Sequence, residues 1–168
     1  LMFLLKSYMQ TLLVMGLIPL GVIGAVLGHF LMGIPVSILS FLGIVALAGI
    51  IVNDSVVLIH KYNNVLQTGM DVPQAIVEAG IARFRPIVLT TITTVAGLAP
   101  IILLRSEQGQ FLVPMAVSVA GGILFGSFIT LLLLPSSLYV ISDLRRFLKR
   151  NKSRKELEPA YQEGLKTD

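Results

Sequence analysis

The sequence predicts an all-α polytopic membrane protein with four transmembrane helices. Of its 168 residues, 55% are hydrophobic and only 13% are charged, and the mean hydropathy is +0.87. Soluble globular domains are far less apolar. The charges are also unevenly placed, because eight of the 13 basic and five of the 9 acidic residues lie between Asp143 and Asp168. The residues before that segment therefore form a membrane-embedded region, and a soluble domain is excluded.

Long stretches without acidic or basic residues locate the four predicted helices, because a helix needs roughly 20 apolar residues to cross the hydrocarbon core. The first stretch, Ser7 to Asn53, is long enough for two helices divided at Met32-Gly33-Ile34-Pro35, where glycine and proline favour a turn. A further stretch lies between Arg85 and Arg105, and another runs from Gln108 to Ser142. The predicted helices are Thr11 to Leu31, Val36 to His60, Pro86 to Leu104 and Phe111 to Ile141.

We expect three parts along the chain. Residues 1–6 are apolar up to Lys6 and are expected to end a truncated preceding helix. Residues 7–144 form the four-helix transmembrane domain, with a cytoplasmic loop at 61–85 in which Asp71 and Pro73 suit the start of a short helix. That helix either lies at the membrane interface or is simply solvated. Residues 145–168 form a basic tail that we expect to be disordered and cytoplasmic.

The basic residues predict the orientation, because Lys and Arg are retained on the cytoplasmic side of a membrane. Lys6, Lys61, Arg83 and Arg85 all fall beside the same ends of the predicted helices, and residues 145–155 add seven more basic residues. Both ends of the chain are therefore expected in the cytoplasm. The lipid bilayer is the expected partner of the tail, through anionic headgroups. The tail has no interleaved aromatic platform, so we expect no nucleic acid partner.

Glycines and histidines within the helices predict packing rather than chemistry. Gly24 and Gly28 on the first helix, like a matching pair on the fourth, have the four-residue spacing of close helix contacts. The two histidines, His29 and His60, have no partner at metal-ligand spacing, and the chain has no cysteine. We therefore expect no metal and no cofactor.

Asp54 is the one acidic residue inside a predicted transmembrane helix, where it follows Asn53 and precedes Ser55. A carboxylate near the bilayer centre costs about 2.5 to 3.5 kcal/mol on insertion scales, so such a residue usually faces a partner or a water-filled cavity. Asp54 is therefore a candidate for exchanging protons within the membrane. The alternative is an Asp that only packs helices through hydrogen bonds, or that lies at the cytoplasmic end of its helix.

Threonines supply hydroxyl groups along the third predicted helix, at Thr90, Thr91, Thr93 and Thr94. A hydroxyl both donates and accepts hydrogen bonds, so it can pass a proton through water. It can equally bond to the backbone of its own helix. Thr90 is expected to face Asn53 and Asp54 across the contact between the second and third helices.

Three segments in the same order as in a known family carry a resemblance to that family. They read IPLGVIGA from Ile18, GIVALAGIIVNDS from Gly43 and RFRPIVLTT from Arg83. Together they resemble the carboxy-terminal membrane half of resistance-nodulation-division exporters, and the resemblance covers roughly Leu1 to Leu144. Several long motifs in one order are more specific than any single motif.

The resemblance implies that the predicted helices are helices nine to twelve of a twelve-helix protomer in a homotrimer of the bacterial inner membrane. It implies export driven by proton entry, with the missing N-terminal part of the same transporter, a periplasmic adaptor and an outer-membrane channel as partners. Carried onto this chain, the proton relay consists of Asn53, Asp54 and Thr90, with Arg83 at its cytoplasmic end. Well-known drug exporters of the family have a lysine where this chain has Asn53. Both Asn53 and Asp54 therefore stay candidates for the position that responds to protonation, and the substrate stays open.

Two other function classes are alternatives to a transporter. An intramembrane aspartyl protease needs two facing acids, and Asp54 has no second one in the predicted helices. We therefore expect that the chain is not an enzyme. A non-transporting membrane scaffold or assembly module, in which Asp54 only packs helices, is the remaining alternative.

Overall fold

The computed structural model describes residues 8–103 and 110–164, with side chains described as far as Asp143. It contains four helices: α2 (Tyr8–Met32), α3 (Ile38–Gln67), α4 (Val72–Ile102) and α6 (Val113–Gly164). By length and composition all four can cross a membrane, α6 through its part Val113–Asp143. The predicted all-α polytopic membrane fold is thus confirmed. The predicted end of a preceding helix at 1–6 lies outside the described residues.

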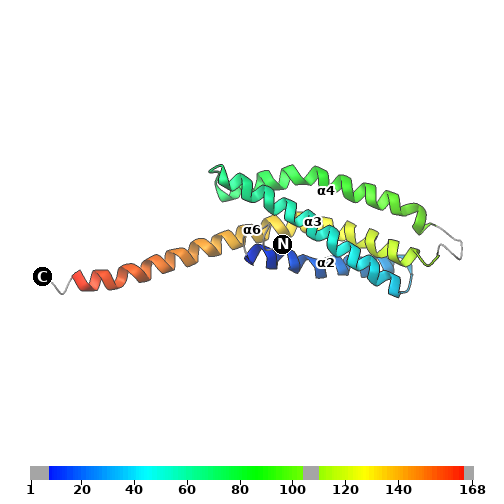
Figure 1. The fold of residues 1–168 in the computed structure, drawn as a ribbon, viewed down its shortest axis with the longest axis horizontal. Coiled ribbons are helices and arrows are strands. Elements are labelled where there is room, and N and C mark those ends of the chain that lie inside the picture. Colours follow the sequence, from blue (N-terminus) through cyan, green and yellow to red (C-terminus); the bar gives the residue numbers. More distant parts are fainter. Residues whose placement is uncertain (1–7, 104–109, 165–168) are drawn as a thin grey trace.

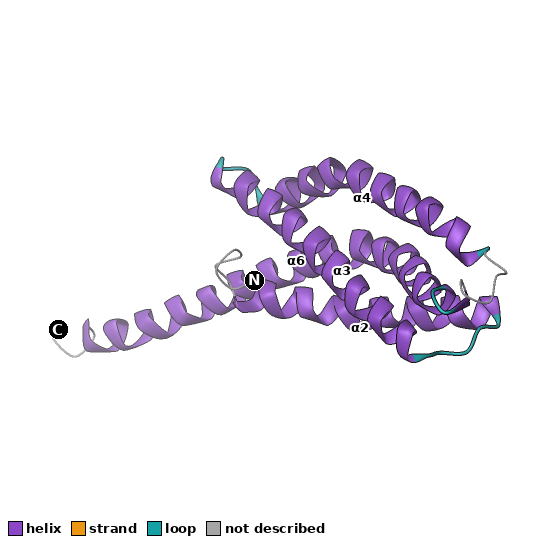
Figure 2. Ribbon diagram, turned by 45° about the vertical axis from the view of Figure 1, so that its right-hand side comes forward, coloured by secondary structure: helices purple, strands orange, loops and turns teal. Residues whose placement is uncertain are grey.

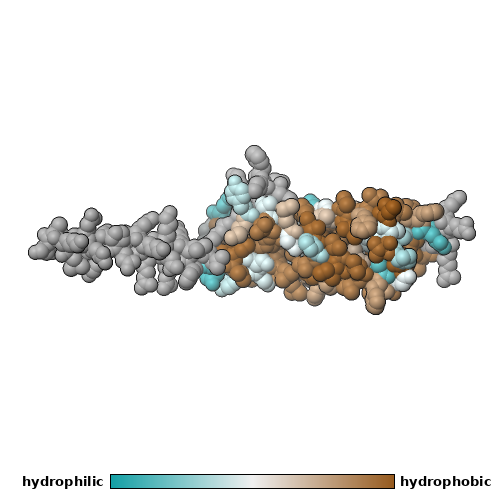
Figure 3. Space-filling model, turned by 90° about the horizontal axis from the view of Figure 1, so that it is seen from below, coloured by the Kyte–Doolittle hydropathy of each residue, from teal (hydrophilic) through white to brown (hydrophobic). Residues whose placement is uncertain are grey.

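The helices form an antiparallel bundle in which α6 contacts each of the other three (Figures 1 and 2). The start of α2, the turn between α3 and α4, and the point where α6 leaves the bundle lie at one end, which we call the tail end. The turn between α2 and α3 lies at the opposite end, which we call the far end. Hydrophobic side chains dominate the visible surface between these two ends, as Figure 3 shows. This is the surface pattern of a bundle that spans a membrane.

The two described turns end their helices with glycines in a left-handed conformation. Gly33 has φ +64°, and the Ile34 amide donates to the carbonyl of His29 at 3.1 Å, which closes α2 at the predicted Gly-Pro turn. Gly69 has φ +86° and follows α3 at the tail end. A residue with a side chain is strained in this conformation, so glycine fits both positions.

The connection between α3 and α4 is shorter than the loop predicted at 61–85. α3 continues to Gln67, and α4 begins at Val72 with Asp71 as its N-cap and a proline in its first turn. The helix start at Asp71 and Pro73 is therefore confirmed, whereas a separate short helix is wrong, because α4 runs on through Pro86. Buried alanines and an isoleucine before Pro86 pack this segment against the bundle. This packing stabilises the helical conformation at a position where proline alone would favour the start of a new helix.

Beyond residue 144 the backbone of α6 continues as a helix to Gly164 and extends away from the bundle (Figure 1). The disorder and the cytoplasmic position expected of residues 145–168 stay predictions.

Glycines determine how closely α2 and α6 approach each other. A methyl group added at Gly121 would lie 2.8 Å from the carbonyl oxygen of Gly24 and 2.9 Å from the Cα of Gly28. These separations are too short for a side chain, so the two backbones are in direct contact. The packing role predicted for Gly24 and Gly28 is confirmed.

Candidate functional site

Three consecutive polar residues of α3 occupy three different environments. Asn53 is exposed, Asp54 is half-buried and Ser55 is completely buried. Successive residues of a helix are rotated by about 100°, so this segment passes from the uncovered side of α3 to its packed side. Asp54 therefore lies at the border between the packed interior of the bundle and the uncovered surface.

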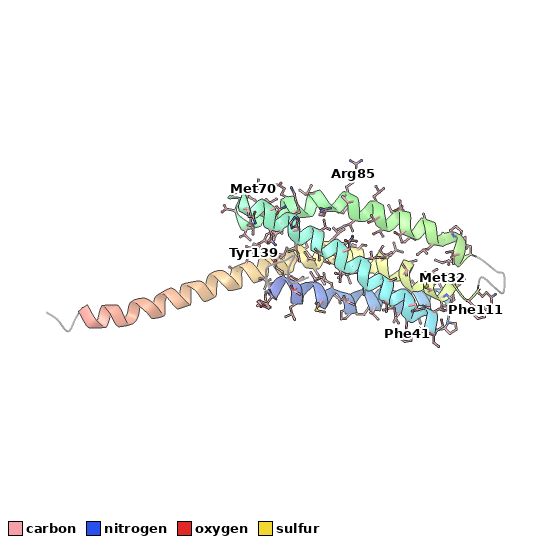
Figure 4. All side chains as sticks on the ribbon, viewed as in Figure 1. Met32, Phe41, Met70, Arg85, Phe111 and Tyr139 are labelled. Atoms are coloured by element: carbon pink, nitrogen blue, oxygen red, sulfur yellow. The ribbon has the colours of Figure 1, made fainter. Side chains whose placement is uncertain are left out.

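The Asp54 carboxylate has an electrostatic partner on α4. The guanidinium of Arg83 lies near enough for its charge to act on the carboxylate, although the two groups form no salt bridge in the described part of the chain. Arg85 is also on α4 but is exposed and points away from the other helices (Figure 4). Of the two arginines directly before Pro86, Arg83 is therefore the one whose charge acts on the Asp54 carboxylate.

Ser55 has an unusual environment beside Asp54. Its hydroxyl oxygen is the one buried side-chain nitrogen or oxygen atom without a hydrogen-bond partner among the described residues. A buried polar group without a partner costs free energy, so such groups are rare in packed proteins. Ser55 was not predicted as a site residue, since a serine within an apolar helix usually serves as a small packing residue.

The threonines of α4 divide between two kinds of hydrogen bond. Thr90 donates to the carbonyl oxygens of Pro86 and Ile87 at 3.0 and 2.9 Å, and Thr93 likewise bonds to its own helix. Thr91 donates to Ile87 at 2.8 Å and also contacts the Ser127 hydroxyl of α6 at 2.8 Å. Thr91, rather than Thr90, is therefore the threonine that joins α4 to another helix.

Thr90 makes no hydrogen bond to Asn53 or Asp54 within the described residues. Its side chain is exposed, as is that of Asn53. The relay contact expected between α3 and α4 thus stays a prediction.

Small and polar residues form an exposed stripe on each of the two helices that carry these candidates. We call them the α3 stripe (Ala46, Gly49 and Asn53) and the α4 stripe (Thr90, Thr93 and Gly97). A methyl group added at Gly49 or Gly97 would meet no atom within 4 Å. In both stripes the spacing of three and then four residues places the side chains on one helix face. Small residues on such a face allow another helix to approach closely.

Hydrogen bonds between polar side chains at the two ends of the bundle were not predicted. At the far end, buried His29 lies 2.8 Å through Nε2 from the Ser118 hydroxyl of α6, and 3.1 Å through Nδ1 from the Ile34 carbonyl oxygen. At the tail end, the side-chain amides of Gln10 and Asn63 join α2 to α3. The isolated polar residues of these uncharged helices could have predicted that such contacts exist, because buried polar groups are nearly always hydrogen-bonded.

Comparison with known proteins decides the family. The sequence profile of the AcrB/AcrD/AcrF family matches residues 1–143. The chain belongs to this family. It is the resistance-nodulation-division family that the three motifs resemble, so that prediction is confirmed.

Individual members of the AcrB/AcrD/AcrF family are similar along most of the chain. The multidrug resistance protein MdtC of Erwinia amylovora is 29% identical over 142 residues, which are 84% of this chain and 14% of that protein. The swarming motility protein SwrC of Bacillus subtilis is 33% identical over 131 residues, 77% of this chain and 12% of SwrC. MdtC of Salmonella schwarzengrund is 28% identical over 154 residues, 91% of this chain and 15% of that protein. The chain spans about a seventh of the length of these relatives.

Family membership and the four apolar helices both indicate a membrane transporter. The chain is a multi-pass membrane region of a transporter family, and it corresponds to one part of a larger transporter. The family is one of transporters rather than of enzymes.

Proposed function

We propose that this chain is the carboxy-terminal membrane part of a proton-driven exporter of the bacterial inner membrane, and that Asn53, Asp54, Thr90 and Arg83 belong to its proton relay. The rest of the transporter supplies the other helices and the route of the substrate. The assembled protein is a homotrimer that works with a periplasmic adaptor and an outer-membrane channel. The MdtC relatives are named multidrug resistance proteins, which makes drug-like compounds the first substrates to test.

The uncovered polar surface beside Asp54 carries this proposal. Asn53 and the threonines of the α4 stripe are exposed in the four-helix bundle, in helices that cross a membrane. Polar side chains facing lipid are costly, so in the complete protein they face other helices or a water-filled cavity. The open glycines of both stripes leave room for helices of the missing part.

Each proposed relay residue has a distinct chemical role. The Asp54 carboxyl takes up and releases the proton, because it is the one carboxyl group among the four residues, whereas Asn53 and Thr90 carry no charge and Arg83 stays protonated. Arg83 stabilises the ionised carboxylate from the tail side. Asn53 donates and accepts hydrogen bonds without changing charge, and Thr90 holds a water molecule through its hydroxyl.

The substitution Asp54→Asn in the full-length transporter tests the relay. The amide keeps the shape of the side chain but cannot exchange a proton, so we expect proton-driven efflux to fall at least about tenfold with normal expression. The matched control is Asp143→Asn, which makes the same exchange at an exposed residue where α6 reaches the tail end. Efflux of a fluorescent drug and proton uptake by vesicles are measured at equal protein levels.

The same variants separate the transporter from a scaffold in which Asp54 only packs helices. A scaffold role predicts lower expression or stability for Asp54→Asn and no proton uptake by the unaltered protein. If Asp54→Asn folds at normal levels and retains full efflux, the relay proposal is wrong.

A further inference from the structure

The Ser55 hydroxyl is enclosed by the bundle and has no hydrogen-bond partner among the described residues. Its side chain is 0% exposed, so the packed helices of this chain cover it completely. A helix from the missing part of the transporter cannot reach the hydroxyl without separating helices that are in contact. Because an unpaired buried hydroxyl costs free energy, it favours a partner small enough to lie within the bundle.

The register of α3 against α6 shows what lies opposite Ser55. Both helices run from the far end to the tail end (Figure 1). The side chain of Leu47 packs on Gly122, and that of Ile51 packs on Gly126 one turn later. Each step is four residues on both helices, so the next step pairs Ser55 with Thr130. The Thr130 side chain is also buried, at 2% exposed.

The layer formed by Ser55 and Thr130 contains less side-chain volume than the layers on either side of it. Toward the far end, Ile51 lies opposite a glycine. Toward the tail end, the same four-residue step pairs Ile59 with Leu134, which are both completely buried. Large side chains therefore separate α3 and α6 before and after this layer, whereas a serine and a threonine meet within it.

The third helix around this layer provides no partner for the hydroxyl. Gly21 of α2 lies against the Ile51 side chain, and α2 runs in the opposite direction to α3. One turn before Gly21, the buried Leu17 is therefore level with Ser55 (Figure 1). A leucine side chain excludes lipid and bulk solvent but forms no hydrogen bond.

From these features we infer that the Ser55–Thr130 layer binds one water molecule between α3 and α6. The Ser55 hydroxyl donates to this water, and the water donates to the Thr130 hydroxyl oxygen. A third hydrogen bond goes to a backbone carbonyl, because a helix carbonyl keeps a second lone pair. Three hydrogen bonds are typical of a buried water.

The chemistry of the layer favours water over other small ligands. The two hydroxyls are uncharged, and a buried ion without an opposite charge is very costly. A metal cation such as calcium also needs six to eight oxygen ligands. An apolar ligand would leave Ser55 unpaired. The inference rests on packing and hydrogen bonding, and it does not depend on the proton relay.

Cryo-electron microscopy of the full-length transporter, at a resolution that shows ordered water, tests the site directly. We expect density for one water within hydrogen-bond distance of both the Ser55 and the Thr130 hydroxyl oxygens. The same map of Ser55→Ala should lack this density. A direct hydrogen bond between Ser55 and a protein atom, or a layer filled by side chains alone, would overturn the inference.

A double-mutant cycle tests whether the two hydroxyls share the water. Ser55→Ala and Thr130→Val each remove one of its partners, so each should raise the equilibrium constant of unfolding about threefold. The double variant should raise it by no more than about threefold, because the shared water is lost only once. The matched control combines Thr130→Val with Ser136→Ala, an exposed serine bonded to its own helix, and these two effects should multiply.

Two results of the cycle contradict a shared water. If Ser55→Ala lowers the unfolding constant, its hydroxyl is unpaired in the native protein. If the effects of Ser55→Ala and Thr130→Val multiply, the two hydroxyls bind no common molecule. Should a variant fail to fold, the density map of the unaltered protein decides between the presence and absence of the water.

Discussion

Neighbouring threonines of one helix have different surroundings, although their side chains are chemically the same. Thr91 is buried against Ser127, whereas Thr90 is exposed and bonded only to its own backbone. The rotation of about 100° between consecutive helix residues produces this difference. The two residues therefore predict different consequences of the same substitution.

Thr90→Val should reduce transport without reducing stability. Valine keeps the shape of threonine and removes the hydroxyl. The lost hydrogen bonds are those to the carbonyl oxygens of Pro86 and Ile87, which still accept hydrogen bonds from the helix backbone, so stability should not fall. Thr90→Ser keeps the hydroxyl and should retain most of the efflux activity. Efflux at matched expression is the measurement, with Ser136→Ala as the control, because Ser136 on α6 is also exposed and also donates to its own helix backbone. If the Val and Ser variants transport equally well, Thr90 has no place in the relay.

Thr91→Val should reduce stability by about 0.6 to 1 kcal/mol, the usual size of a hydrogen bond between transmembrane helices. The affected contact is the 2.8 Å hydrogen bond to Ser127. A double-mutant cycle with Ser127→Ala, followed by denaturation of the full-length protein in detergent, measures the coupling between the two residues. Effects that simply add would show that this hydrogen bond does not stabilise the contact between α4 and α6.

The sequence was sufficient to select Asp54 but insufficient to find its surroundings. An acidic residue within an otherwise uncharged helix can be recognised from the sequence, because the free energy of placing a carboxylate in the membrane depends on that residue alone. Which side of α3 is covered depends on contacts with α2 and α6, so the burial of Ser55 and the exposure of Asn53 could not be predicted. Arg83 was selected through family resemblance rather than from spacing.

At the scale of elements, α4 is the helix that the bundle covers least. Its buried residues all lie between Ala75 and Thr91, and none of the residues from Ile92 to Ile102 is buried. The far half of α4 is therefore not covered by the other described helices of this chain. α2, by contrast, is fixed against α6 by contacts between glycine backbones.

Gly121→Ala should destabilise the protein by about 1 to 3 kcal/mol, because the added methyl group forces the backbones of α2 and α6 apart. Gly16→Ala is the matched control, since a methyl group at Gly16 would meet no atom within 4 Å. Denaturation midpoints of the two full-length variants are compared. An unchanged midpoint for Gly121→Ala would mean that the helices are not in direct backbone contact.

Helix number and order were predictable, but helix length was not. Hydrophobicity marks only the part of a helix that crosses the apolar core. α3 and α4 continue through polar residues at the tail end, where contacts such as the Lys61–Glu78 ion pair lie. Pro86 looked like a helix start because proline favours first turns, and packing of the preceding turns overrides this preference.

At the scale of the whole molecule, the two ends of the bundle should lie on opposite sides of the membrane, with the tail end in the cytoplasm. The tail end carries Lys61, Arg83 and the basic tail, so it should be retained there. The chain has no cysteine of its own, which simplifies labelling. A cysteine at Asn64 should be protected from an impermeant reagent in intact cells, and one at Gln110 should be labelled. The reverse pattern would invert the proposed orientation.

The central place of α6 has a consequence for how the protein is made. α2, α3 and α4 leave the ribosome before α6, and α3 already contacts α2 and α4, but the glycine contact of α2 and the contact of Thr91 with Ser127 both need α6. The glycine face of α2 and the hydroxyl of Thr91 therefore have no contact with α6 in the membrane until that last helix is inserted. Biogenesis of this region has a late decisive step, and a chain interrupted before Val113 should be recognised by membrane proteases as unassembled helices.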